Sequence, residues 1–231
     1  MTPSLQELKN KQLVWFASQQ KQKINQYLST GYSVLDDALQ GGWPASGVVE
    51  VNPESLGIGE LRLLLPVFER LASAKPLQAW INPPACLTPH NLGATSLART
   101  VVISCAQEKQ QCWAFEQMLG SGCCSSLVFW TDSLSATQAK RLQLAAKDGG
   151  TLAFIISMAQ RQNQSLPLSL RMSLNAHSQG LSIDIFKRQN AWPVAPFTLD
   201  LSLSWPQLFR RAKRFSEAPN PDNVLPFPGR V

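Results

Sequence analysis

Short, mostly apolar runs alternate with amphipathic segments between residues 47 and 156, and this alternation constrains the fold more than any other feature. The apolar runs cover residues 47–51, 77–81, 100–103, 126–130 and 151–156. Helical periodicity is found between them, at 60–71, 92–98, 108–119 and 136–146. Parallel strands need helical crossovers and are buried on both faces, so they are apolar almost without interruption. The pattern therefore predicts an α/β fold with a mostly parallel sheet flanked by helices.

The two ends of the chain have a different character. Residues 168–174 and 181–187 alternate apolar and polar positions, which predicts an antiparallel C-terminal hairpin. Near the N-terminus, Ser4 and Glu7 form a capping-box pattern, which predicts a helical arm over residues 4–28. The lysines of this arm indicate either a solvated helix face or a docking arm for another protein. For a chain of 231 residues we expect an arm (1–29), a core (30–203), and a basic helix with a Pro-rich tail (204–231).

Composition limits the function classes. The 21 Lys and Arg residues against 15 Asp and Glu give a net charge of +6, which suits a nucleic-acid or acidic-protein partner. Five cysteines without a Cys-x-x-Cys pair, and only two histidines, favour reduced thiols and no metal site. No apolar run approaches the roughly 20 residues that span a bilayer, and the start of the chain lacks the pattern of a secretory signal. We expect a cytoplasmic protein with no membrane contact.

The segment after the first apolar run has the context of a phosphate-binding P-loop but not its chemistry. A P-loop reads G-x-x-x-x-G-K-[ST] between a strand and a helix. Here Asn52 stands at the first glycine, Gly57 at the second, Ile58 at the lysine and Gly59 at the Ser/Thr. Glu60 then adds a negative charge that favours the helix dipole but repels phosphate. The sequence predicts no nucleotide cofactor and no enzymatic activity, with a residual ATPase as the least favoured alternative.

A second carboxylate also stands at a position typical of nucleotide-binding sites. Asp132 directly follows the segment 127–131 at the end of an apolar run, where nucleotide hydrolases carry an acid that helps to hold magnesium. Without the P-loop lysine and hydroxyl, we interpret Asp132 as the N-cap of the helix that follows Ser133. Neither His90 nor His177 has a nucleophile and a supporting acid near it in the sequence, so we predict no catalytic residues.

Residues 29–57 resemble the opening of the RecA recombinase core. That family has the string TG…LD.AL.GG.P.G…E..GPESSGKT; the matching segments here are Thr30–Gly31, Leu35–Asp36, Ala38–Leu39, Gly41–Gly42 and Asn52–Gly57. The similarity extends from about Thr30 to about Leu201 and implies a RecA-like core. The lost P-loop lysine and Ser/Thr, together with a short segment at 159–167 where recombinases carry a DNA-binding loop, argue against ATP-driven filament formation and strand exchange.

A RecA-like core of this length without a working P-loop, followed by the segment 186–193, is similar to the ImuA family. This resemblance implies a non-catalytic adaptor of the bacterial SOS response. Its partners would be RecA, the inactive polymerase relative ImuB, or both, within an error-prone polymerase complex that performs translesion synthesis. The same superfamily includes SulA, a division inhibitor that binds FtsZ, and this is the alternative. The hairpin, the basic segment and the long tail favour ImuA.

Two basic clusters are candidate contacts for a partner or for DNA. The first cluster lies on a helix predicted to begin at Pro206 and comprises Arg210, Arg211, Lys213 and Arg214. The second is Lys187 and Arg188, at the edge of the predicted hairpin. Both clusters are suited to contact DNA phosphates, with an affinity that depends on salt. The alternatives are a solvated surface or a contact surface for an acidic protein. The apolar, Pro-rich segment 224–229 indicates either an extended peptide that docks in a partner's groove or a free terminus.

Overall fold

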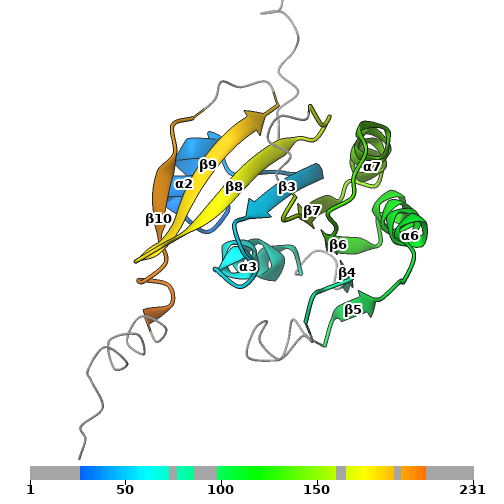
Figure 1. Cartoon of the computed structure of the whole chain (residues 1–231), viewed down its shortest axis with the longest axis horizontal. Helices are drawn as coiled ribbons and strands as arrows, with labels where there is room; N and C mark the ends of the chain where they lie inside the picture. The colour runs from blue at the N-terminus through cyan, green and yellow to red at the C-terminus, as the bar shows by residue number, and fades with distance from the viewer. Residues whose placement is uncertain (1–26, 73–76, 86–97, 160–164, 190–193, 207–231) are drawn as a thin grey trace, which may run out of the picture.

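One mixed sheet organises the molecule. The computed structural model describes residues 27–72, 77–85, 98–159, 165–189 and 194–206 (Figure 1). The strands of this sheet are β3 (Gly47–Pro53), β4 (Leu77–Ile81), β5 (Thr100–Ile103), β6 (Cys124–Trp130), β7 (Leu152–Ile156), β8 (Leu170–His177), β9 (Gly180–Arg188) and β10 (Phe197–Asp200). Their order is β10-β9-β8-β3-β7-β6-β4-β5. Neighbours from β8 to β5 pair in parallel, whereas β8-β9 and β9-β10 are antiparallel.

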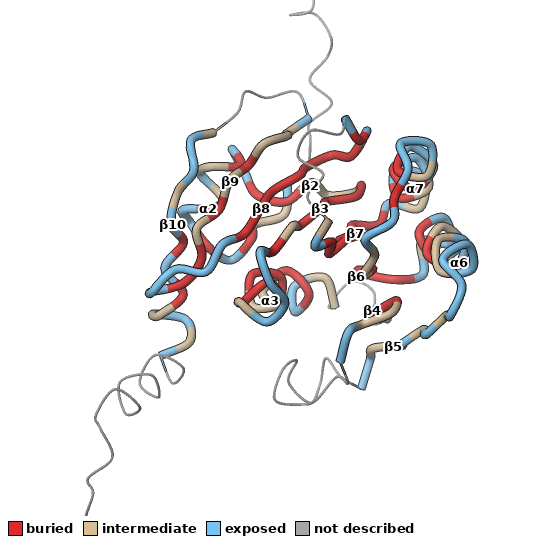
Figure 2. Tube along the Cα trace, viewed as in Figure 1, coloured by how far each residue is buried: buried red, intermediate tan, exposed pale blue. Residues whose placement is uncertain are grey.

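Helices cover both faces of the parallel part. They are α2 (Ser33–Leu39), α3 (Glu60–Leu71), α6 (Glu108–Ser121) and α7 (Ala136–Asp148). Strand β3 shows how the faces divide, because Val49 and Val51 pack with α2 and α3, whereas Val48 packs with α6 and α7. Figure 2 shows the buried strands between these two layers. The predicted parallel sheet, its flanking helices and the antiparallel hairpin are confirmed.

Three predicted helical segments cannot be compared with the structure. The N-terminal arm up to residue 26, the segment 92–97 and the basic helix after Pro206 lie outside the described residues. In the part of the chain that the structure describes, every helix is too short or too polar to cross a membrane.

The last two residues of the predicted arm are not helical. Tyr27–Leu28 form strand β1, which pairs antiparallel with β2 (Trp43–Pro44). Strand β2 is distant from β1 in the sequence, so local periodicity does not predict this pairing. Gly42 permits the close approach, because its φ is +113° and a Cβ there would lie 2.2 Å from the Leu28 carbonyl oxygen.

Asp36 holds the chain between β1 and α2. Its carboxylate accepts hydrogen bonds from the Ser29 hydroxyl at 2.6 Å and the Thr30 backbone N–H at 2.7 Å. Burial alone would raise the pKa of Asp36, but these hydrogen bonds outweigh burial and hold the pKa below its ordinary value. Part of the native stability therefore depends on the ionised carboxylate.

The variant Asp36→Asn is expected to unfold at lower urea concentration than the wild type at pH 7. A carboxyl whose pKa is lower in the folded state stabilises above its unfolded pKa, and this contribution is lost as the pH falls. The difference between wild type and variant should therefore narrow below about pH 4. Urea titrations at pH 7 and pH 3 measure it, with the exposed neighbour Asp37→Asn as the control. A gap of equal size at both pH values would contradict the assignment.

Candidate functional site

The segments that follow β3, β6 and β7 meet at the edge of the sheet where these parallel strands end. Val51 and Trp130 both lie beside Ile156 in the strand register, so these three strands end at one level. From β3 the chain crosses to β4 on one side, whereas β7 connects to β8 on the other side of β3. Open α/β sheets bind ligands at such a place. We call this region the carboxyl edge; it comprises residues 52–60, 131–132 and 157–159.

A carboxylate of the chain itself accepts hydrogen bonds from the backbone amides of the P-loop-like segment. The Glu60 carboxylate accepts hydrogen bonds from the Gly57 N–H, at 2.9 and 3.1 Å to its two oxygens, and from the Gly59 N–H at 3.1 Å. Glu60 is only 5% exposed. In a P-loop, backbone N–H groups of this kind surround phosphate. Here their hydrogen-bonding capacity is taken by a side chain.

The conformation of this loop also disfavours the missing P-loop residues. Gly59 has φ +129°, a conformation that side-chain-bearing L residues rarely adopt, so Ser or Thr at this position would be strained. Ile58 packs against the core between the sheet and α3, whereas a P-loop lysine points to the phosphates. The departures from the motif therefore fit a loop with a different geometry.

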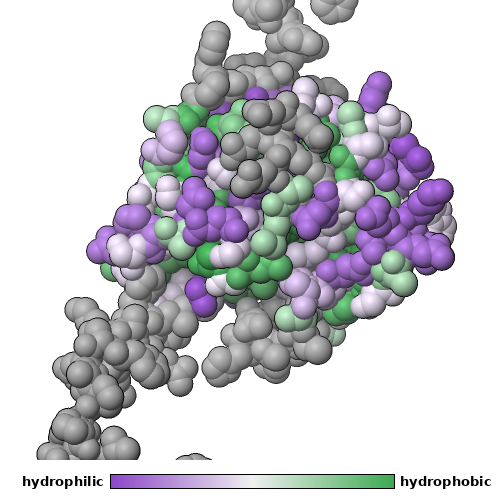
Figure 3. Space-filling model, in the orientation of Figure 1, coloured by the Kyte–Doolittle hydropathy of each residue, from purple (hydrophilic) through white to green (hydrophobic). Residues whose placement is uncertain are grey.

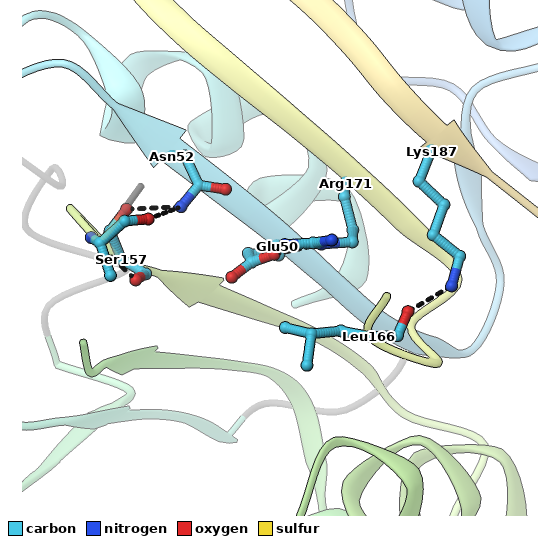
Figure 4. Close-up of polar contacts among 7 residues, drawn as sticks. Glu50, Asn52, Ser157, Leu166, Arg171 and Lys187 are labelled. Carbon is cyan, nitrogen blue, oxygen red and sulfur yellow. Dashed lines mark hydrogen bonds and ion pairs between the residues drawn. The ribbon is translucent and has the colours of Figure 1, made fainter. Parts of the chain in front are cut away.

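Two polar side chains hold the segment after β7 in place. The Asn52 amide donates to the carbonyl oxygens of Ser157 at 2.9 Å and Ala159 at 3.2 Å (Figure 4). The Asp132 carboxylate accepts from the Met158 N–H at 2.7 Å, the Ala159 N–H at 3.2 Å and the Ser157 hydroxyl at 3.3 Å. Asn52 and Asp132, which the sequence analysis placed at positions of a nucleotide site, thus bind the protein's own backbone.

The predicted role of Asp132 as a helix N-cap is wrong. Helix α7 begins four residues later, at Ala136, and its N-cap is Ser135, which forms a reciprocal capping box with Gln138. Asp132 is therefore not needed for this helix and turns to the end of β7 instead. Asn52, at the position of the first P-loop glycine, is a strand residue, because β3 continues to Pro53.

The carboxyl edge is acidic in a basic protein. It carries Glu54, Glu60 and Asp132, and its sequence contains no lysine or arginine. Glu54 is exposed and accepts a hydrogen bond from the Ala176 N–H at 2.7 Å. No group of three His, Cys, Asp or Glu side chains able to hold a metal occurs within the described ranges. The local charge opposes the binding of a phosphate anion.

Next to this edge lies a buried ion pair that the sequence interpretation missed. Glu50 on β3 and Arg171 on β8 are register partners, and the Arg171 guanidinium donates to the Glu50 carboxylate (Figure 4). Glu50 is 0% and Arg171 1% exposed, and the guanidinium also lies 4.9 Å from the centre of the Phe186 ring. The available signal was a single charged residue in each of the two strand sequences, 47–53 and 170–177.

The second basic cluster makes contacts inside the molecule. The Lys187 ammonium donates to the Leu166 carbonyl oxygen (Figure 4), and burial followed by the Arg171 charge lowers the pKa of Lys187. Arg188 donates to the Ala38 carbonyl oxygen at 2.7 Å, which joins β9 to α2. Both side chains are half-buried, so phosphate contact by them stays a prediction. The first basic cluster lies outside the described residues; its members are Arg210, Arg211, Lys213 and Arg214.

Comparison with known proteins finds similarity among solved structures but no match to a sequence family. No family model and no curated protein matches the sequence. Among solved structures, the chain is similar to the crystal structure of SulA from Pseudomonas aeruginosa, with 24% sequence identity and a TM-score of 0.39. The match covers 47% of this chain and 96% of the SulA chain. These comparisons do not establish a family for the protein.

Proposed function

We propose that this protein is a non-catalytic adaptor of the bacterial SOS mutagenesis response. In this role it binds RecA, an ImuB-type inactive polymerase relative, or both, and supports translesion synthesis after DNA damage. The observation that carries the proposal is the Glu60 carboxylate on the amides of Gly57 and Gly59, in a segment whose sequence resembles the start of a RecA core. The specific partners come from the sequence resemblance to the ImuA family.

The geometry favours protein binding over nucleotide chemistry for two physical reasons. A nucleotide needs amide donors, a cation and a magnesium ligand, and here Glu60 uses the donors while Ile58 and Gly59 supply neither of the others. The described residues nevertheless form a sheet with helices packed on both faces, so the fold can still present surfaces to other proteins. The expected function is therefore that of a scaffold whose partner binding does not depend on ATP.

Affinity capture from DNA-damaged cells tests the adaptor proposal. With ATP and magnesium omitted, we expect the full chain to recover RecA or an ImuB-type subunit in the amount recovered when both are present. A variant that lacks residues 2–25 tests the arm and keeps β1, because Tyr27 and Leu28 pair with Trp43 and Pro44. If the arm docks the partner, this variant stays folded by circular dichroism and loses capture.

Two results would overturn the proposal. Capture that appears only when ATP and magnesium are restored would indicate a working nucleotide site. Recovery of FtsZ, with filamentous cells on overexpression, would instead indicate the SulA-like alternative, a division inhibitor. The two readouts separate partner identity from nucleotide dependence.

A further inference from the structure

Two apolar side chains are exposed at the carboxyl edge. Leu56, in the loop between β3 and α3, is 40% exposed, and Met158, directly after β7, is 45% exposed. Figure 3 shows hydrophobic surface over the part of the molecule where Figure 1 places α3 and the end of β3. Single exposed apolar side chains are common on protein surfaces, but two of them at the P-loop-like edge suggest a binding surface.

The backbone beneath both side chains is held in place. On one side of Leu56, the Glu54 N–H donates to the Leu174 carbonyl oxygen at 2.8 Å, and on the other the Gly57 N–H donates to Glu60. The Met158 N–H donates to Asp132 at 2.7 Å. A preorganised surface loses little conformational entropy when a partner binds. Glu60 and Asp132 therefore hold the backbone that carries these two apolar side chains in a fixed arrangement.

The charge around these side chains selects the partner. Glu54 and Asp132 are both exposed, and the carboxyl edge has no positive side chain to balance them. A nucleic acid or an acidic peptide would be repelled here, whereas lysine or arginine would be attracted and would associate faster. The complementary ligand is a peptide segment with an apolar side chain flanked by positive charges.

We propose that the carboxyl edge is a docking surface for a partner protein segment that carries an aliphatic or aromatic side chain between lysines or arginines. Leu56 and Met158 contact the apolar side chain, and Glu54 and Asp132 face the flanking cations. This inference rests on the proposed adaptor function and assigns that function a surface. The surface would use the P-loop-like segment and its neighbours for protein recognition.

Peptide binding to the full chain tests this surface. The probe is a fluorescent 12-residue peptide in which leucines alternate with lysines and arginines, followed by fluorescence anisotropy. The variants Leu56→Asp and Met158→Asp should each weaken binding by about tenfold or more, an effect typical of a central contact residue. Leu144→Asp is the matched control, because Leu144 is 53% exposed on α7 and should leave affinity unchanged. Higher salt should also weaken binding, because exposed charges are screened.

Further peptides and the capture assay complete the test. A peptide with glutamate in place of lysine and arginine should not bind, and binding of this peptide as tight as that of the probe would overturn the proposal. An equal loss of probe affinity in Leu144→Asp and Leu56→Asp would also overturn it. If a peptide of residues 206–217 of this chain binds more tightly than the probe, the surface is occupied by this chain's own segment and the partner proposal fails. If RecA or ImuB is captured but the peptides do not bind as expected, the docking surface is rejected and the adaptor function is retained. If the peptides bind as expected but neither RecA nor ImuB is captured, the docking surface is retained and the proposed partners of the adaptor are rejected.

Discussion

Replacing Arg171 with methionine is expected to lower the free energy of unfolding by about 3–5 kcal/mol. Glu50, its ion-pair partner, is 0% exposed, so the variant leaves a carboxylate buried without its counter-charge. Its second oxygen, Oε1, already finds no hydrogen-bond donor among the described residues. The pair joins β3 to β8, the strand at which the sheet changes from parallel to antiparallel pairing.

The double variant Glu50→Leu with Arg171→Met is the control for this prediction. Replacing both charges with apolar side chains removes the desolvation cost together with the attraction, so most of the lost stability should return. Urea denaturation of the wild type, both single variants and the double variant gives the coupling free energy. A loss below about 1 kcal/mol in Arg171→Met, or a double variant as unstable as the sum of the singles, would contradict a desolvated pair.

The parallel core could be predicted from the sequence because its signal is local and repeated. Strands β3 to β7 are short apolar runs, and α3, α6 and α7 have helical periodicity between them. Strands β1 and β10 were not predicted. They have two and four residues, respectively, and each exists because a distant segment, β2 or β9, offers hydrogen bonds to it. Neither sequence contains the continuous apolar run that indicates β3 to β7.

The candidate site was predictable in composition but not in geometry. Ile58, Gly59 and Glu60 already indicated a lost phosphate site, and the sequence interpretation assigned Glu60 a repulsive effect. That its side chain turns back onto the loop amides depends on the loop conformation. Asp132 was misassigned because its main donor, the Met158 N–H, lies 26 residues away and is brought near by the pairing of β6 with β7.

Replacing Glu60 with alanine is expected to destabilise the protein by about 2–3 kcal/mol. Hydrogen bonds to a charged group contribute about 1.5–3 kcal/mol, and a buried donor left without an acceptor costs about 1–3 kcal/mol. The buried Gly59 amide would lose its acceptor, whereas Gly57 is exposed and can bond to water. Glu69→Ala, at an exposed position of the same helix, is the control and should have little effect. Urea denaturation and hydrogen exchange at the Gly57 and Gly59 amides measure the loss; equal stability of both variants would contradict it.

The same residue decides whether restoring the P-loop lysine could restore nucleotide binding. Ile58→Lys supplies the missing cation, but the Glu60 carboxylate still occupies the amides of Gly57 and Gly59. We therefore expect ATP and magnesium to leave the melting temperatures of the wild type and of Ile58→Lys unchanged. A ligand that binds only the folded state must raise the melting temperature, so a rise of several degrees in either protein would show an open site. Stabilisation that appears only when Ile58→Lys is combined with Glu60→Ala would identify the carboxylate as the group that keeps phosphate out.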